Sequence, residues 1–227
     1  MPSRRRRRER PNPPARGDIQ PKKTILVVCE GPVSEKQYVE CLKQFIGNPG
    51  VNIIYSRKHG VPRTIVDTAK QECQELRAVY REEFDEAWCI FDRDLHPNFN
   101  ASIQTARDRG YHLAVSNPCF ELWLWLHHRP SPGPQIHTQM QDMLKQQVDT
   151  DYDKSIQDGF YFSSDKPVKL AVASAFGLER QAFEAGDPPF GNPSTTMYKL
   201  VVSMAKINKQ GQQIVFFAGW EWLSHYS

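Results

Sequence analysis

The chain has 227 residues, of which 39% are apolar, 11% aromatic and 24% charged, with a formal net charge of +3. This composition excludes a collagen-like chain, a low-complexity chain and a disulfide-stapled miniprotein, and the length suits one globular domain with an appendage. Residues 1–23 carry a net charge of +7 and the remainder −4, which excludes an evenly basic protein that coats nucleic acid.

The first predicted segment, residues 1–23, is a disordered basic arm. It is rich in arginine and proline and poor in apolar side chains, so it buries too little surface to offset the entropy of ordering. The arginines that suit contacts with nucleic-acid phosphates are Arg4, Arg5, Arg6, Arg7, Arg8 and Arg10. A nuclear localisation patch and a solubilising tail are alternative interpretations of this run.

From residue 24 onwards, short apolar runs alternate with stretches of helical periodicity. Strands are predicted over 24–29, 51–55, 87–91 and 111–115, and helices from Ser34, over 64–83, over 99–109 and from Asn117. Ser34 with Gln37 resembles a capping box, and Asn117-Pro118 is a favourable helix start. We therefore predict an α/β fold with a parallel sheet of about four strands, flanked by helices.

Beyond residue 128 the strand signals stop. Helices are predicted over 135–147, 167–183 and 194–208, while the apolar run 213–217 has no assigned place. We predict a core over residues 24–128 and a mainly helical C-terminal region over 129–227.

The five cysteines are far apart and form neither a C-x-x-C pair nor a Cys/His cluster at zinc spacing. Such a set is typical of reduced thiols in a cytoplasmic protein. The most apolar windows, 25–29 and 122–126, are far shorter than the roughly 20 residues that span a bilayer. We therefore expect no membrane association.

Acidic residues follow two of the predicted strands. Glu30 comes directly after the first strand, and Asp92 and Asp94 follow the third. The carboxyl ends of parallel strands bind ligands, so these three carboxylates can converge. Close carboxylates repel one another unless a hard cation such as Mg²⁺ or Mn²⁺ neutralises them, and Mg²⁺ keeps coordination sites for phosphate oxygens. The pattern favours a metal site for phosphodiester cleavage.

Each acidic element also has a purely structural interpretation. An aspartate after a strand commonly forms a turn or caps a helix, and Glu-Gly is a weaker signal. Glu35 is interpreted as a favourable charge in the first turn of a helix. The order of the two elements, each preceded by a strand, favours the metal site.

Several segments resemble the RloB-like family, whose core looks like the Toprim fold of topoisomerases, primases and nucleases of the "overcoming lysogenization defect" type. The main segments are Ile25-Leu-Val-Val-Cys-Glu-Gly31 with Glu35, Ile90-Phe-Asp-Arg-Asp-Leu-His96, and Ser116-Asn-Pro-Cys-Phe-Glu-Leu-Trp123 with His127. Tyr152-x-Lys154 and Pro193-Ser-Thr-Thr196 match more loosely, and together the resemblance spans most of residues 24–208. The third main segment is specific, whereas the glutamate and D-x-D elements are shared by Toprim proteins.

The resemblance implies a metal-dependent nuclease acting in bacterial antiphage defence by abortive infection, often with an ATPase partner encoded nearby. Its substrate would be RNA, with transfer RNA one target class, or DNA. In this sequence Glu30 becomes the general acid/base or first metal ligand, and Asp92 and Asp94 become metal ligands. Glu121 and Lys154 become further catalytic candidates.

Both further candidates have open alternatives. Glu121 lies one turn into its predicted helix, where it could reach the metal edge, pair with an arginine or favour the helix dipole. Lys154 could stabilise the charge that develops on phosphorus, or it could be a solvated lysine in a loop.

Core packing is favoured over base stacking for Trp123 and Trp125, and a structural role over a catalytic one for His96 and His127. Two other functions use the remaining features. A D-x-D nucleotide-sugar transferase would use Asp92 and Asp94 but would leave Glu30 without a role. A non-enzymatic module would dock on an ATPase and bind nucleic acid through the arm.

Overall fold

A computed structural model describes residues 23–47, 51–81, 83–93, 98–156 and 158–205. Four predictions lie outside these residues: the basic arm with its six arginines, Asp94, His96 and the apolar run 213–217.

The sheet has five strands in the order β2-β1-β3-β4-β5. The strands are β1 Lys23–Cys29, β2 Val51–Tyr55, β3 Glu86–Asp92, β4 His112–Asn117 and β5 Ser194–Thr195. The first four are parallel, and β5 pairs antiparallel with β4. The prediction of an α/β fold with a mostly parallel sheet is confirmed, and the architecture is consistent with a Toprim-like fold.

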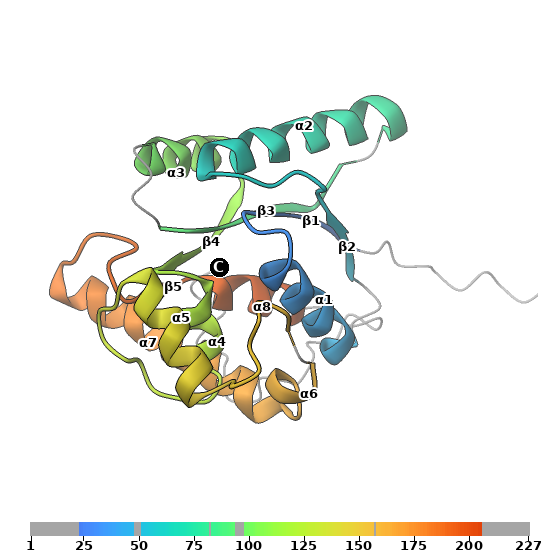
Figure 1. The fold of residues 1–227 in the computed structure, drawn as a ribbon. Coiled ribbons are helices and arrows are strands. Elements are labelled where there is room, and N and C mark those ends of the chain that lie inside the picture. The colour runs from blue at the N-terminus through green and yellow to red at the C-terminus, as the bar shows by residue number, and fades with distance from the viewer. Residues whose placement is uncertain (1–22, 48–50, 82, 94–97, 157, 206–227) are drawn as a thin grey trace, which may run out of the picture.

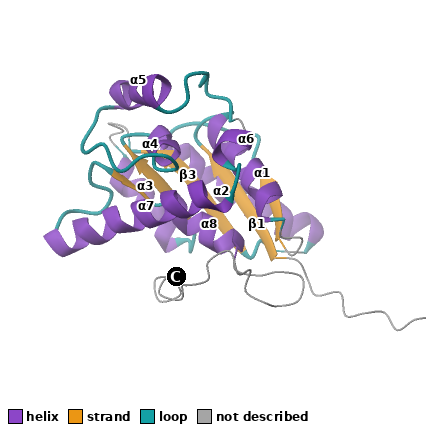
Figure 2. Ribbon diagram, turned by 90° about the horizontal axis from the view of Figure 1, so that it is seen from below, coloured by secondary structure: helices purple, strands orange, loops and turns teal. Residues whose placement is uncertain are grey.

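Helices cover both faces of the sheet (Figure 1). They are α1 Ser34–Ile46, α2 Pro62–Tyr80, α3 Phe99–Asp108, α4 Phe120–Trp125, α5 His137–Gln147, α6 Asp158–Tyr161, α7 Asp165–Ala185 and α8 Met197–Ala205. The α2 and α3 helices lie on one face and the others on the opposite side, which Figure 2 shows from below. None of the helices in the described ranges is long and apolar enough to cross a membrane.

Strand β1 shows why the sheet is covered on both sides. Ile25 and Val27 point into the core beneath α1, α4 and α8, whereas Leu26 and Val28 point into the core beneath α2 and α3. All four side chains are buried. A strand that is apolar at successive positions is stable only between two layers of helices.

Three local predictions are wrong, each because a tertiary contact replaces a helix cap or turn. Ser34 makes no capping hydrogen bond; its hydroxyl donates to the carbonyl oxygen of Lys154 at 2.7 Å. Asn117 stays in β4 and donates its side-chain amide to the carbonyl oxygen of Phe190 at 2.7 Å. Helix α4 therefore begins only at Phe120, and the segment predicted as helix from residue 194 first forms β5.

Residues beyond 128 take part in the same architecture. They supply β5 to the sheet, and α8 packs against β4 and α1. Met197, Leu200 and Met204 belong to the same buried cluster as Ile25 and Val27. The boundary at residue 128 stays a prediction.

An aromatic cluster joins α1 to α4 beneath the sheet. The ring of Tyr38 lies 5.9 Å from that of Trp123, 5.5 Å from that of His127 and 5.1 Å from that of Phe162. The Nδ1 atom of His127 donates to the carbonyl oxygen of Trp123 at 2.9 Å, so its Nε2 atom accepts the Tyr38 hydroxyl at 3.0 Å. The tryptophans and His127 are thus buried core residues.

The burial of His127 predicts an acid-sensitive fold. Desolvation lowers the pKa of His127 to about 3, compared with about 6.5 for an unfolded chain. Between these values the unfolded state binds a proton that the folded state does not, so stability is lost as pH falls. The free energy of unfolding should decrease by up to about 1.4 kcal/mol per pH unit from this group. Urea unfolding at several pH values from 7 to 4.5 measures the slope.

The test variant is His127→Gln, and His59→Gln is its control. His59 is exposed, so its replacement is the control for the loss of a histidine outside the core. The His127→Gln variant should be less stable at pH 7 but should lose less stability on acidification. Equal slopes for the wild type and His127→Gln would show that this histidine does not govern the acid response.

Candidate functional site

The site is built at the carboxyl edge of the parallel strands, where β1 and β3 lie side by side. The register pairs Cys29 with Ile90, so the residue after β1 reaches the end of β3. The backbone N–H of Glu30 donates to the carbonyl oxygen of Ile90 at 2.9 Å. In return, the backbone N–H of Asp92 donates to Glu30 Oε2 at 2.9 Å. The structure thus brings together Glu30 and Asp92.

A third carboxylate, Glu35, lies behind this pair. It stands in the first turn of α1, is only 7% exposed and accepts the backbone N–H of Gly31 at 3.2 Å. Burial raises the pKa of Glu35, and the negative charges of Glu121 and Glu30 raise it further. A Cβ atom at Gly31 would lie 2.7 Å from Glu35 Oε2. Glycine therefore allows this carboxylate to fold back towards the sheet edge.

The sequence interpretation of Glu35 as a helix-dipole charge missed this position. The available signal was its place in the first turn after Glu30-Gly31, since the start of α1 faces the same edge as the end of β1. The dipole contribution persists, but the burial of the side chain makes Glu35 part of the acidic group.

Glu121 approaches the edge from α4. This helix begins just after β4, so its first turn lies at the carboxyl end of the sheet. The Glu121 side chain is 4% exposed, and its Oε1 atom accepts the Tyr152 hydroxyl at 3.1 Å and the Gln141 amide at 2.9 Å. Its charge contributes to the raised pKa of Glu35, and it stands in the first turn of α4, where it also favours the helix dipole. A catalytic role for Glu121 stays a prediction.

Lys154 belongs to a loop that crosses the start of α1. Its side chain is exposed, and its backbone has a positive φ of 75°. The loop is held by Ser34, whose hydroxyl donates to the Lys154 carbonyl oxygen at 2.7 Å, and by Gln37, which accepts the N–H of Ile156 at 2.9 Å. A catalytic role for its ammonium group stays a prediction.

The structure also assembles a group that the sequence did not predict. The ligand atoms of Cys119, Glu121 and His137 lie within 4.8 Å of one another, and this group could bind a metal ion. Burial raises the pKa of Cys119, as do the charges of Glu121 and Asp92. The sequence spacing of the cysteines and histidines does not indicate this group, because it forms only when α5 brings His137 to the start of α4. Only the short Cys119-x-Glu121 spacing was visible as a signal.

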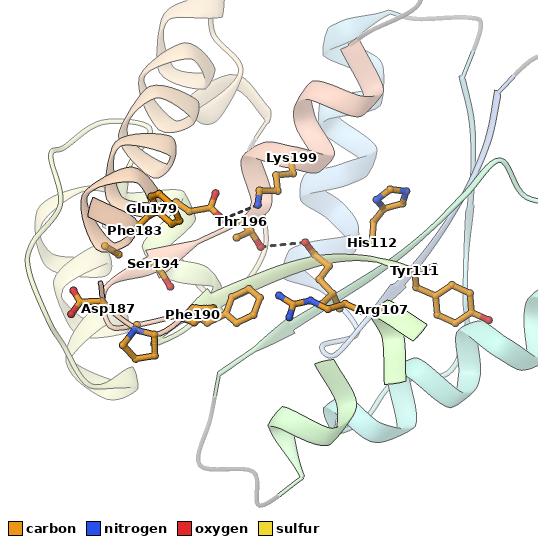
Figure 3. Close-up of a pocket in the computed structure, with 15 residues that line it drawn as sticks. Arg107, Tyr111, His112, Glu179, Phe183, Asp187, Phe190, Ser194, Thr196 and Lys199 are labelled. Carbon is orange, nitrogen blue, oxygen red and sulfur yellow. Dashed lines mark hydrogen bonds and ion pairs between the residues drawn. The ribbon is translucent and has the colours of Figure 1, made fainter. Parts of the chain in front are cut away.

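A separate cavity of about 380 Å³ lies between β4, β5, α7 and α8 (Figure 3). Arg107, Phe190 and Lys199 line it, and none of the predicted site residues does. The cavity wall nevertheless contacts the acidic edge, because the carbonyl oxygen of Phe190 accepts hydrogen bonds from Asn117 and from Arg93, the residue after Asp92. The cavity is therefore a neighbour of the acidic edge.

The chain was compared with known proteins. A family model described as RloB-like protein matches residues 25–204. The matched region includes all of the carboxylates described above. No curated protein and no solved structure matches the chain.

Proposed function

The chain belongs to the RloB-like family, and from this premise we propose that it is a metal-dependent nuclease that hydrolyses phosphodiester bonds. The observation that carries the proposal is the hydrogen bond that joins Glu30 to the end of β3 at Asp92. It holds the Glu30 carboxylate against the backbone of Asp92, at the edge of the sheet where α/β proteins bind ligands.

The donor set supports a hard divalent cation. Glu30 and Asp92 offer carboxylate oxygens, which Mg²⁺ and Mn²⁺ accept as ligands, and Asp94 follows two residues later in the chain. The buried Glu35 and Glu121 add negative charge behind them. A bound cation would offset the repulsion within this group.

The residues divide the chemistry between them. When bound, the metal supplies an activated water and stabilises charge on the oxygens of the phosphate. Glu30, Asp92 and Asp94 would hold it, and Glu30 is also suited to proton transfer. Glu121 is positioned by Tyr152 and Gln141, which hold its carboxylate in one orientation. Lys154 would stabilise charge on the phosphorane from its exposed loop.

The family premise extends the proposal to the biological role. We infer an effector of bacterial antiphage defence that acts by abortive infection in the cytoplasm, together with an ATPase partner. The substrate is RNA, including transfer RNA, or DNA. A non-enzymatic module that docks on an ATPase is the alternative, and a nucleotide-sugar transferase is disfavoured because Glu30 would have no role in it.

The direct test is cleavage of defined substrates by the purified full chain. Transfer RNA, unstructured RNA and plasmid DNA are incubated with Mg²⁺ or Mn²⁺, with and without the purified ATPase partner. Metal-dependent cleavage that stops on chelation is the expected result. Calorimetric titration with Mg²⁺ and Mn²⁺ separates the alternatives: absence of both cleavage and metal binding at the carboxylates would identify the non-enzymatic module.

Deletion of residues 1–20 should weaken nucleic-acid binding without changing metal binding. Residues 1–23 carry a net charge of +7 and the remainder −4, so loss of the arm should weaken nucleic-acid binding. It should also flatten the plot of log affinity against log salt concentration, by up to about 0.7–0.9 for each arginine that contacts a phosphate. Fluorescence anisotropy at several salt concentrations measures both effects, and calorimetry should find metal binding unchanged.

The control replaces six of the deleted arginines with glutamine and leaves the chain length unchanged; they are Arg4, Arg5, Arg6, Arg7, Arg8 and Arg10. It should reproduce the deletion. If either variant loses metal binding instead, the arm takes part in the metal site and the proposed division is wrong.

A further inference from the structure

We propose that Cys119, Glu121 and His137 form a second metal site, which binds a zinc-class cation rather than Mg²⁺. Their ligand atoms, a sulfur, a carboxylate oxygen and a ring nitrogen, lie within 4.8 Å of one another. This mixed set is typical of Zn²⁺, whereas Mg²⁺ prefers oxygen ligands. The inference does not rest on the proposed nuclease activity: Glu30, Asp92 and Asp94 take no part in it, and Glu121 is the residue that the two proposals share.

The backbone fixes two of the ligands before any metal binds. Cys119 is the extended residue that precedes α4, and Glu121 lies in the first turn of that helix. Both side chains are buried, with 0% and 4% of their surfaces exposed. Buried side chains have fewer accessible rotamers than exposed ones. Metal binding therefore costs little side-chain conformational entropy at these two positions.

The third ligand comes from the first residue of α5. His137 is only partly buried, so the group has a side open to solvent through which a cation can enter. The thiol of Cys119 lies 3.9 Å from the carbonyl oxygen of His137, and α4 packs against α5. The two segments that supply ligands are therefore in direct contact, not merely close across a gap.

Gln141 reveals how the ligands are oriented. It stands one turn after His137, and its Nε2 atom lies 2.8 Å from His137 Nε2 and 2.9 Å from Glu121 Oε1. An amide nitrogen can only donate, so His137 Nε2 accepts and directs its lone pair towards the same amide nitrogen that Glu121 binds. That tautomer is the one that binds metals through Nε2.

The amide nitrogen of Gln141 thus occupies a point where two acceptors converge. A cation at this point would bind the same two acceptors, Glu121 Oε1 and His137 Nε2. It would also bind the Cys119 sulfur, which does not contact the amide in the hydrogen bonds described. Tyr152 donates to Glu121 Oε1 at 3.1 Å, and in the metal-bound state it would orient the carboxylate from outside the ligand set. The fourth position would be filled by water.

Cobalt substitution tests the site with a readout separate from cleavage. The full chain is stripped with a chelator and titrated with Co²⁺, whose bond to a thiolate gives a charge-transfer band in the near-ultraviolet. We expect the band to saturate at one equivalent, to be displaced by Zn²⁺ and to persist in excess Mg²⁺. A folded wild-type protein without this band would overturn the proposal.

Variants assign the ligands. Cys119→Ser should abolish the band, and His137→Ala should weaken cobalt affinity by more than the about 10–100-fold typical of an outer-shell partner. Cys73→Ser and His112→Gln are the controls, since these residues lie on α2 and at the start of β4, and both should retain it. Circular dichroism confirms folding, and persistence of the band in Cys119→Ser would contradict the assignment.

Two more variants test the role of Gln141 and separate this proposal from the nuclease proposal. Gln141→Ala removes the competing donor without removing a ligand, so it should bind cobalt at least as tightly as the wild type. Asp92→Asn should keep the band even when cleavage is lost, which distinguishes failure of the nuclease proposal from failure of this one. A large loss of affinity in Gln141→Ala would show that the amide group, and not the proposed triad, dominates binding.

Discussion

Replacing Asp92 with asparagine should reduce metal-dependent cleavage by about a hundredfold to a thousandfold while leaving the fold intact. The change removes one negative ligand but keeps the shape of the side chain. The contact with Glu30 uses the backbone N–H of Asp92, so it survives the replacement. Loss of a metal ligand worth several kcal/mol of charge stabilisation corresponds to such a factor. Initial rates of cleavage at saturating Mg²⁺ measure it.

The matched control is Asp108→Asn. Asp108 ends α3 and is exposed, so the same chemical change there should leave the rate unaltered. Glu30→Gln should lose activity to a similar degree as Asp92→Asn. Alanine replacement of either Asp92 or Asp94 should also abolish cleavage. Full activity in both aspartate variants would rule out the proposed mechanism.

Replacing Tyr38 with alanine should cost about 3–5 kcal/mol of stability, the range expected when a buried aromatic side chain is truncated. Tyr38 is 0% exposed and lies at the centre of the aromatic cluster between α1 and α4. Its hydroxyl also donates to His127 Nε2, so truncation leaves a cavity and an unpaired ring nitrogen. Denaturant unfolding, monitored by circular dichroism, measures the loss.

Two variants separate the packing contribution from the hydrogen bond. Tyr38→Phe keeps the ring and should cost only about 1–3 kcal/mol, the penalty for a buried polar group left without a partner. Tyr80→Ala truncates a tyrosine that is 68% exposed at the end of α2 and should change stability by less than about 0.5 kcal/mol. Equal losses at positions 38 and 80 would contradict the proposed core.

The fold class and the position of the residues at the strand ends could be predicted from the sequence. The run 24–29 is apolar at nearly every position, so both of its faces must be covered when it pairs as a strand. A parallel sheet with helices on both faces is the structure that provides this cover. Glu30 and Asp92 then meet because the ends of parallel strands share one edge. The fold class and this part of the acidic group could therefore be predicted from local pattern alone.

The rest depends on contacts between distant segments. Tyr152 reaches Glu121 and Ser34 only because the loop after α5 passes over the start of α1. His137 has no sequence spacing that points to Cys119, and its position is set by how α5 packs on α4. Strand β5 has two residues, too few for any period to distinguish it from the helix that follows.

Among the described residues, β5 is the last strand of the sheet to be added during synthesis. Thr195 bonds Ser116 through a pair of hydroxyls 2.9 Å apart, and Thr196 bonds the backbone of Val115. A ribosome adding 5–20 residues per second reaches this segment roughly 5–20 s after it has added Asp92. A nascent chain therefore carries Glu30 and Asp92 for several seconds before the fifth strand of the sheet has been added.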